Sequence, residues 1–209
     1  MNILFLDWKC FNRNETISVI EELGHHVYCF IHEDYPNYKS DDFEKEFHLF
    51  CEKHQIDACF SYNYFSLLAS GCHTRNIFYF SFIYDSPCIQ LFSYTAMYDT
   101  NRIFSFDSAI VERFRNGGLK HIYYMTLPAN TKKWNHLATL VHNTNRSVSD
   151  LSFVGALYDE QHNLYDDKLH LDNHLYLKGY LNGIMDAQSM IYGYNFIEDM
   201  LTPDILASL

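Results

Sequence analysis

A doubly wound, Rossmann-like parallel α/β sheet with a C-terminal helical extension is the fold class that this sequence predicts. Over the first 130 residues, short apolar runs alternate with segments whose apolar residues recur at helical spacing. Strands that alternate with helices form parallel β-α-β units with right-handed crossovers. After residue 157 the strand pattern stops and the segments that follow are helical. These two observations predict one sheet domain followed by helices.

Short apolar runs mark the strands. The first, at 3–6, is continuously apolar and ends at Asp7, which suits a strand that is buried on both faces. Similar runs recur along the chain between segments of helical period. The predicted strands are 3–6, 27–31, 56–61, 77–84, 102–106 and 122–125.

Segments whose apolar residues recur at helical spacing lie between these predicted strands. After the first strand, Ile17, Ile20 and Leu23 recur at helical spacing. Gly24 then ends the helix, because glycine readily adopts the left-handed conformation of a helix C-terminus. Further helices are predicted from about residue 41, over 65–72, and between Asp107 and Gly117.

Three regions divide the chain. Residues 1–130 form the sheet domain, 131–157 form a polar linker with one added strand at 151–157, and 158–209 form the helical extension. In the extension, a helical pattern begins near Asp172, and Thr202 precedes Pro203 and an acidic residue. A hydroxyl cap followed by proline is a strong helix start.

Composition narrows the class of protein. The chain has 209 residues, 48% of them apolar, and a formal charge of -11. We expect no nucleic-acid binding, because it requires a basic face that neutralises phosphates. The first residues lack the basic start and apolar stretch of a signal peptide. The six cysteines form no C-x-x-C pair and fall mostly in apolar runs, so a soluble, cytoplasmic protein with reduced thiols is predicted.

Polar and aromatic residues at the strand ends are the candidate site. Ligands of open parallel sheets bind outside the carboxyl ends of the strands. Asp85 is the candidate catalytic base, because Pro87 after it indicates a shaped loop. Asp107 has an equally good alternative role as a helix cap. The remaining candidate substrate-binding residues are Asp7, Trp8, Lys9, Tyr84, Ser86, Asp107 and Asn130.

The sequence lacks the motifs of three common kinds of site: a dinucleotide site, a phospho-receiver site and a metal site. The first strand-helix turn contains no glycine, so a dinucleotide pyrophosphate could not approach the backbone there. The third strand ends at Asn63 in place of the Asp that a phospho-receiver domain needs. His170 and His174 are spaced like metal ligands on a helix, but no third ligand lies in register. We therefore expect no bound metal or cofactor.

Three segments together, the start, the middle and the stretch at 118–131, resemble the amino-terminal domain of CgeB-type (spore-maturation-protein-like) bacterial glycosyltransferases, and 152–155 resembles the first strand of their nucleotide-sugar domain or its approach. The opening ILFLDWKCF, the central YDSP with NRIFSFD after it, and GLKHIYYMTLPANT occur in the order and spacing of that family. The resemblance covers essentially the whole chain. The segments are 3–11, 22–27, 84–87, 101–107, 118–131 and 152–155.

This resemblance implies the GT-B architecture, in which an acceptor-side and a nucleotide-sugar-binding Rossmann-like domain face a cleft. It implies a glycan, lipid-linked or protein acceptor, and a nucleotide-sugar donor bound by the C-terminal domain. After Gly155 the family continues into that second α/β domain, whereas here residues 158–209 are predicted to be helical and look like the connector that some members insert between the domains. The chain is therefore expected to be a fragment or a stand-alone acceptor module that is inactive alone.

Two alternatives remain open at this stage. The first is a non-enzymatic interaction module in which the exposed aromatic surface of the tail forms a homodimer or docks a partner domain, since a GT-B amino-terminal domain without its second half would expose apolar surface. The second is a flavodoxin-like protein that binds a small nucleotide.

Overall fold

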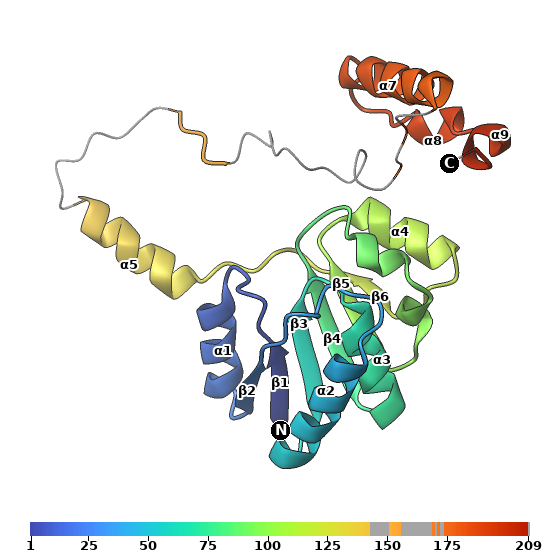
Figure 1. Cartoon of the computed structure of the whole chain (residues 1–209). Coiled ribbons are helices and arrows are strands. Elements are labelled where there is room, and N and C mark those ends of the chain that lie inside the picture. The colour runs from blue at the N-terminus through green and yellow to red at the C-terminus, as the bar shows by residue number, and fades with distance from the viewer. Residues whose placement is uncertain (143–150, 156–168, 170, 172–173, 209) are drawn as a thin grey trace. The chain divides into compact units, whose positions relative to one another are not determined.

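The computed structural model describes residues 1–142, 151–155, 169, 171 and 174–208 (Figure 1). The chain divides into two compact units, Met1–Arg146 and Ser147–Leu209. The first unit contains the sheet and the helices α1 to α5, and the second contains α7 to α9. Each unit is described by itself.

A six-stranded, all-parallel sheet forms the centre of the first unit, in the order β2-β1-β3-β4-β5-β6. The doubly wound fold class is thereby confirmed. The chain moves outward from β1 to β2, then reverses through β3, so the topological switch lies between β1 and β3. The strands are β1 (Asn2–Leu6), β2 (His26–Phe30), β3 (Ala58–Tyr62), β4 (Phe78–Ile83), β5 (Asn101–Ser105) and β6 (Ile122–Tyr124).

Three helices cover one face of this sheet and form the larger core with it. Phe43 and Phe47 of α2, Leu68 of α3 and Val111 of α4 are buried together with one set of strand side chains. Ser40 begins α2 by accepting a hydrogen bond from the Phe43 backbone N–H. The covering helices are α2 (Asp41–His54), α3 (Ser66–Arg75) and α4 (Ser108–Asn116), with the 3-10 turns η1 (Ile89–Phe92) and η2 (Tyr94–Met97) between β4 and β5.

Gly71 allows α3 to pack closely on α2. A Cβ atom added at Gly71 would lie 2.7 Å from two ring atoms of Phe47. Phe47 is fully buried, so its ring has little room to yield. The absence of a side chain at Gly71 therefore sets the distance between these two helices.

The opposite face of the sheet carries aromatic side chains in register across neighbouring strands. We call this set the aromatic face; its members are Phe60, Phe80, Phe82, Phe104 and Tyr123, on β3 to β6. Rings touch from strand to strand, with centroids 6.5 Å apart for Phe82 and Phe104 and 5.5 Å apart for Phe104 and Tyr123. The aromatic face is thus one continuous surface.

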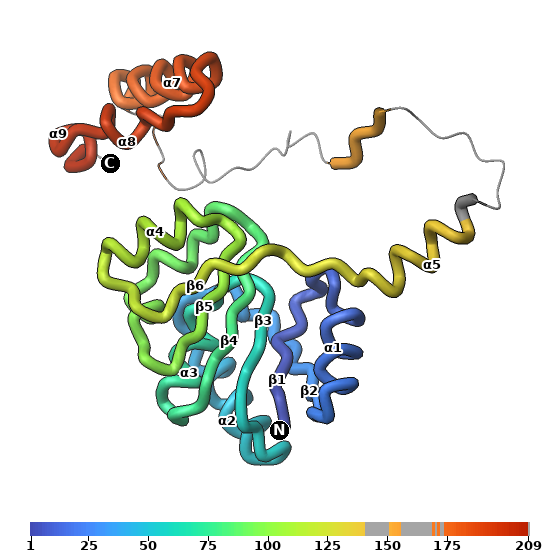
Figure 2. Tube along the Cα trace, turned by 180° about the vertical axis from the view of Figure 1, so that it is seen from behind, coloured from blue at the N-terminus to red at the C-terminus, as the bar shows by residue number. Residues whose placement is uncertain are grey.

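Helix α1 (Arg13–Glu22) packs on this same side, beside β1 and β2. Its Ile17 contacts the cluster that contains Phe5 and Phe82, and within residues 1–142 no other helix contributes to that cluster. In Figure 2 the strands β3 and β4 are seen from this side with no helix drawn in front of them. Phe78, at the start of β4 on this side, is 48% exposed. Within residues 1–142, three helices therefore pack on one face of the sheet and α1 alone on the other, where Phe82 is 6% exposed and the other rings of the aromatic face are half-buried.

The region expected as a linker contains a helix, α5 (Thr131–His142). Asn130 caps it, because its Oδ1 accepts the Lys133 backbone N–H at 2.9 Å. The strand expected at 151–157 is not formed in its described part, 151–155, where Leu151, Phe153 and Val154 are exposed. A strand needs a neighbouring edge for its backbone hydrogen bonds, and an apolar run alone does not supply one.

The second unit is a small helical body, as the extension was expected to be. It comprises α7 (Leu175–Ser189), α8 (Ile197–Met200) and α9 (Pro203–Leu206). Thr202 caps α9 by accepting the Ile205 backbone N–H, which confirms the helix start that the sequence predicts there. Leu171, Leu177, Leu181 and Ile205 form its core. Asp172, where the first helix of this region was expected to begin, lies outside the described residues.

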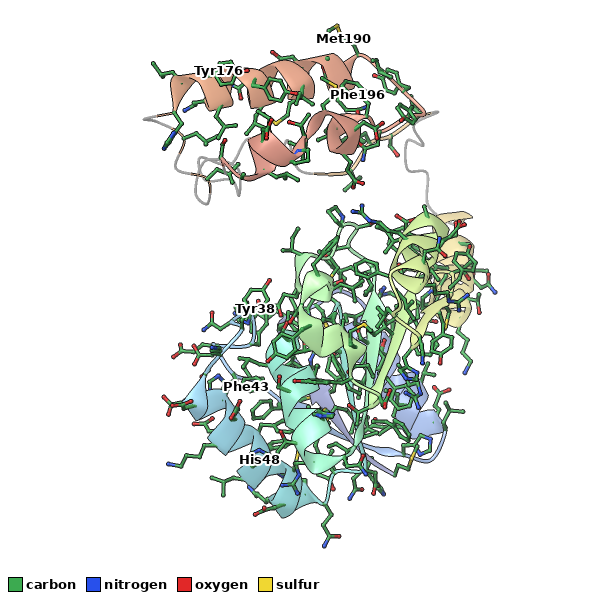
Figure 3. The ribbon with its side chains drawn as sticks, turned by 90° about the vertical axis from the view of Figure 1, so that its right-hand side faces the viewer. Tyr38, Phe43, His48, Tyr176, Met190 and Phe196 are labelled. Atoms are coloured by element: carbon green, nitrogen blue, oxygen red, sulfur yellow. The ribbon has the colours of Figure 1, made fainter. Side chains whose placement is uncertain are left out.

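One side of α7 in this unit is bare. Tyr176 and Met190 lie along its outer side and are 80% and 75% exposed, whereas Phe196 lies on the side toward α8 (Figure 3). Gly179 and Gly183 of α7 have open space where a Cβ would be. None of the described helices combines the length and apolar character that crossing a bilayer requires.

Candidate functional site

The carboxyl ends of β1, β3, β4 and β5 bring most of the predicted site residues to one edge of the sheet. Asp7 follows β1, Asp85 follows β4 and Asp107 follows β5. Because these strands are parallel and adjacent in the order β1-β3-β4-β5, the three carboxylates share that edge. They do not share partners, since each is held by a different group of residues.

Asn63 is the residue that organises the centre of this edge. It follows β3, is 8% exposed and has a left-handed backbone with φ of 56°. Its Nδ2 donates to Asp85 Oδ2 at 2.6 Å, and its Oδ1 accepts the backbone N–H groups of Tyr84 and Asp85 at 3.3 Å each. One buried side chain thereby fixes both the backbone and the carboxylate at the end of β4.

Asp85 itself is exposed. Among the described residues, Asn63 is the side chain that hydrogen-bonds it, through Oδ2. The Oδ1 atom therefore remains to accept a hydrogen bond from a bound molecule. This combination of an oriented carboxylate and an accessible oxygen is what a general base requires.

Asp107 acts as the cap of α4, the alternative role that the sequence left open for it. Its Oδ1 accepts the backbone N–H groups of Ala109 and Ile110 at 3.0 and 3.2 Å. Its Oδ2 accepts the Ser86 hydroxyl at 2.9 Å. Both oxygens thus have structural partners, and Ser86 links the β4 loop to the start of α4.

Asp7 is paired with a cation and not directed at a ligand. Arg13 Nε donates to Asp7 Oδ2 at 2.5 Å, and the Asp7 side chain is only 9% exposed. The hydrogen bond to Asp7 raises the pKa of the Arg13 guanidinium above its usual value. Arg13 also donates to the Cys29 thiol, so this group anchors the start of α1 against β2.

Trp8 is enclosed by other aromatic rings. Its Nε1 donates to the Tyr62 carbonyl at 3.0 Å. Its ring centroid lies 5.9 Å from Phe65, 6.0 Å from Tyr84 and 6.2 Å from Tyr35. Trp8 is only half-buried, so it offers a part of its surface to a ligand while it supports Tyr84.

The outer predicted residues lie at the margins of this arrangement. Lys9 is exposed and has a left-handed backbone with φ of 63°. Asn130 is engaged as the cap of α5. Neither residue lines the hollow that opens at this edge of the sheet.

A hollow of about 280 Å³ opens beside these strand ends, on the side of the aromatic face. The loop after β1, the ends of β3 and β4, and the segment after β6 meet there, next to the topological switch. Such a volume lies at the lower end of the range for small-molecule sites, about 300–1,000 Å³. Its lining residues are Phe11, Asn12, Tyr62, Tyr84, Leu127 and Pro128.

Tyr84 is the predicted residue that lines this hollow. Its hydroxyl is buried and has no hydrogen-bond partner among the described residues. Burial raises the pKa of the Tyr84 phenol, although the nearby Phe11 backbone N–H opposes this in part. The phenol therefore stays protonated and can both donate and accept a hydrogen bond. The Tyr62 hydroxyl, by contrast, has a hydrogen-bond partner, since its oxygen lies 2.7 Å from Thr16 Oγ1.

A second concavity, of about 340 Å³, lies in the helical unit and is lined by His174, Leu175, Tyr176, Leu177 and Ser208. It contains no carboxylate and no Lys or Arg side chain. We regard the hollow at the sheet edge as the candidate site, because it lies at the carboxyl ends of β3 and β4 and is lined by Asn12, Tyr62 and Tyr84.

No group of three His, Cys, Asp or Glu side chains that could hold a metal ion occurs in the described part of the chain. His170, one member of the predicted histidine pair, lies outside that part. No family model matches this chain, and no curated protein matches its sequence.

Proposed function

We propose that the sheet domain is the acceptor-binding domain of a GT-B glycosyltransferase similar to the bacterial CgeB-type enzymes, acting in the cytoplasm. The observation that carries the proposal is the Asn63–Asp85 pair at the ends of β3 and β4. An exposed carboxylate held by a buried amide follows Tyr84, which lines a cavity large enough for about one sugar ring.

In this proposal Asp85 removes the proton from the acceptor hydroxyl as that oxygen attacks the anomeric carbon of the donor. The bond from that carbon to the diphosphate oxygen breaks, and the nucleoside diphosphate leaves with the electron pair. Asn63 holds Asp85 Oδ2, so Oδ1 faces the hydroxyl. The Tyr84 phenol forms a further hydrogen bond to the acceptor, and the exposed part of Trp8 contacts its ring. The nucleotide sugar binds to a second α/β domain, whereas the elements described in residues 174–208 are helices. The chain alone is then inactive.

Saccharide binding to the chain tests this function directly. Monosaccharides and short oligosaccharides are titrated into isotope-labelled protein, and amide NMR shifts are followed. We expect saturable shifts at Phe11, Asn12 and Tyr84, weakened by Asp85→Asn and unaffected by Asp42→Asn, which makes the same charge change on α2. Shifts at these amides with nucleotides, and none with any saccharide, would contradict the proposal and favour a flavodoxin-like nucleotide site.

Exposed apolar side chains of the second unit favour a second candidate function, a protein-interaction module. Large exposed apolar surfaces mark association sites. Tyr176 and Met190, on the outer side of α7, are 80% and 75% exposed. This function does not require a sugar site, and it could coexist with one.

A further inference from the structure

Three buried hydroxyl groups lie next to Asn63, on the two central strands of the sheet. Ser61 of β3 and Ser81 of β4 are neighbours in register, and Tyr79 lies two residues before Ser81, on the same side of β4. All three side chains are fully buried. Burying a hydroxyl costs free energy unless it is hydrogen-bonded. The partners of these hydroxyls therefore show what the group holds in place.

The hydroxyls converge on one acceptor, the backbone carbonyl of Asn63. Ser61 Oγ donates to this carbonyl at 2.6 Å, and Ser81 Oγ donates to it at 3.1 Å. The Tyr79 oxygen lies 2.6 Å from Ser61 Oγ and accepts the Phe65 backbone N–H at 3.1 Å. Because Ser61 uses its only proton on Asn63, the Tyr79 proton goes to Ser61 Oγ, with the Asn63 oxygen farther away at 3.4 Å. We call Ser61, Tyr79 and Ser81 the hydroxyl clamp.

The hydroxyl clamp holds Asn63 in a conformation that its backbone alone does not favour. Asn63 has φ of 56°, and a residue with a Cβ atom keeps such a conformation only where its surroundings fix it. Its carbonyl is bound by the clamp, while its side chain binds the Asp85 carboxylate and the N–H groups of Tyr84 and Asp85. Fixing the carbonyl also fixes the direction of the Cα–Cβ bond of the same residue. The clamp therefore aims the Asn63 side chain at the end of β4.

The clamp also supports the aromatic part of the candidate site. Phe65, whose N–H is accepted by Tyr79, is 7% exposed, and its ring centroid lies 5.9 Å from that of Trp8. The Trp8 ring in turn lies 6.0 Å from the ring of Tyr84. One buried phenol thus connects the support of Asp85 with the support of Trp8.

We propose that Tyr79 is a positioning residue, which orients the Asp85 carboxylate through Ser61 and Asn63. Tyr79 is fully buried, so it acts through Asn63 and does not touch the substrate. Without the phenol hydroxyl, Ser61 Oγ loses its donor and the Phe65 N–H loses its acceptor. The Asn63 carbonyl is then held less firmly, and the carboxylate moves more freely. The inference rests on the proposed role of Asp85 as the base.

Hydrogen exchange of the full chain tests this role in Tyr79→Phe. The backbone amides of Tyr84 and Asp85 both donate to Asn63 Oδ1, so their exchange rates report whether Asn63 keeps its position. We expect both amides to exchange at least about tenfold faster in Tyr79→Phe, relative to β1 amides, which report unfolding of the whole sheet. Tyr64→Phe is the matched control, because Tyr64 is equally buried but its hydroxyl bonds η2. It should leave the ratio of these rates unchanged.

Two results would overturn the inference. The first is equal relative exchange of the Tyr84 and Asp85 amides in the wild type and in Tyr79→Phe. The second is the same acceleration in Tyr64→Phe, because loss of any buried phenol would then suffice. If Tyr79→Phe does not fold, Ser81→Ala replaces it, since it removes a smaller group that also binds the Asn63 carbonyl. It should accelerate the same two amides by a smaller factor.

Saccharide titration separates this inference from the proposed function. For a saccharide that binds the wild type, Tyr79→Phe should raise the dissociation constant at least about threefold, whereas Tyr64→Phe should not. An unchanged affinity in Tyr79→Phe would show that the position of Asp85 does not matter to the acceptor and would also overturn the inference. Faster exchange of the Tyr84 and Asp85 amides without saccharide binding would support the positioning of Asp85 and contradict the glycosyltransferase function.

Discussion

Asn63 donates its side-chain amide to Asp85 across the ends of β3 and β4, with 2.6 Å between Nδ2 and Oδ2. The two residues are 22 positions apart in the chain and belong to adjacent parallel strands. Asn63 also accepts two backbone N–H groups from the same loop. The carboxylate that we assign to the chemistry is thus oriented by a residue that is itself buried.

Asn63→Ala should lower the free energy of unfolding by about 2–3 kcal/mol, because it leaves two part-buried backbone N–H groups without their acceptor and places a Cβ-bearing residue without a polar side chain in the left-handed region. Asn63→Gly removes the same hydrogen bonds without the backbone strain, so it should cost about 1–2 kcal/mol less. Urea unfolding measures both. Equal losses would indicate that the left-handed backbone contributes nothing.

Asp85→Ala should reduce turnover at least about 100-fold in a full-length enzyme that contains this domain, since a positioned general base contributes about 10²–10⁴-fold. Tyr84→Phe should weaken acceptor binding with a smaller effect on turnover. Steady-state kinetics with saturating donor separates the two effects. An unchanged rate in the Asp85 variant would remove this residue from the role of base.

Gly71→Ala should destabilise the first unit by about 1–3 kcal/mol, as overpacking of a filled core does. The added Cβ would meet the Phe47 ring at 2.7 Å. Gly179→Ala, on α7, is the control. Its Cβ would meet nothing within 4 Å, and alanine is favoured over glycine in helices by up to about 1 kcal/mol. Hydrogen exchange of α3 and α7 amides reports the two units separately.

Stability should fall as the pH rises above 9.0, and Cys10 should account for part of this loss. Burial, followed by the nearby Asp7 charge, raises the pKa of Cys10 from 9.0 to about 11. Between these values the unfolded state has released a proton that the folded state retains, so rising pH favours unfolding. At 1.36 kcal/mol for each pH unit, the loss is about 2–3 kcal/mol.

Chemical denaturation between pH 8 and 11 measures this loss of stability. Cys10→Ala removes the Cys10 contribution and should flatten the profile, although burial also raises the pKa of Cys29 and Cys88. A profile in Cys10→Ala as steep as that of the wild type would show that the Cys10 thiol is not buried in solution.

The local sequence pattern was sufficient to predict the strands and most helices of the first unit. The predicted strand at 3–6 is β1 (Asn2–Leu6), and the helix expected from about residue 41 is α2 (Asp41–His54). In both cases apolar periodicity arises within a few residues and needs no distant partner. Helix α5 was not predicted from the sequence, because its few apolar residues lie within a long polar region. Its apolar residues Trp134, Leu137 and Leu140 and its cap Asn130 are nevertheless visible in the sequence.

The roles of individual site residues could not be derived in this way. Asp85, Asp107 and Asn130 all look like available polar groups at the ends of apolar runs. The structure shows that Asp107 and Asn130 cap helices. Asn63 was noted at a strand end but was not expected in the site. Asparagine tolerates the left-handed conformation better than most residues, so Asn63 after a strand was a signal for a special turn. That Asp85 is its partner could not be derived from the sequence.

The sequence by itself determined the parallel sheet, the acidic composition and the residues that follow each strand, because these depend on composition and on short-range order. Only the tertiary structure decided which strand ends are neighbours, and therefore that Asn63 holds Asp85 and Arg13 neutralises Asp7. It also decided that, in residues 1–142, three helices pack on one sheet face and α1 alone on the other, because the side on which a helix packs does not depend on how strongly that helix is favoured.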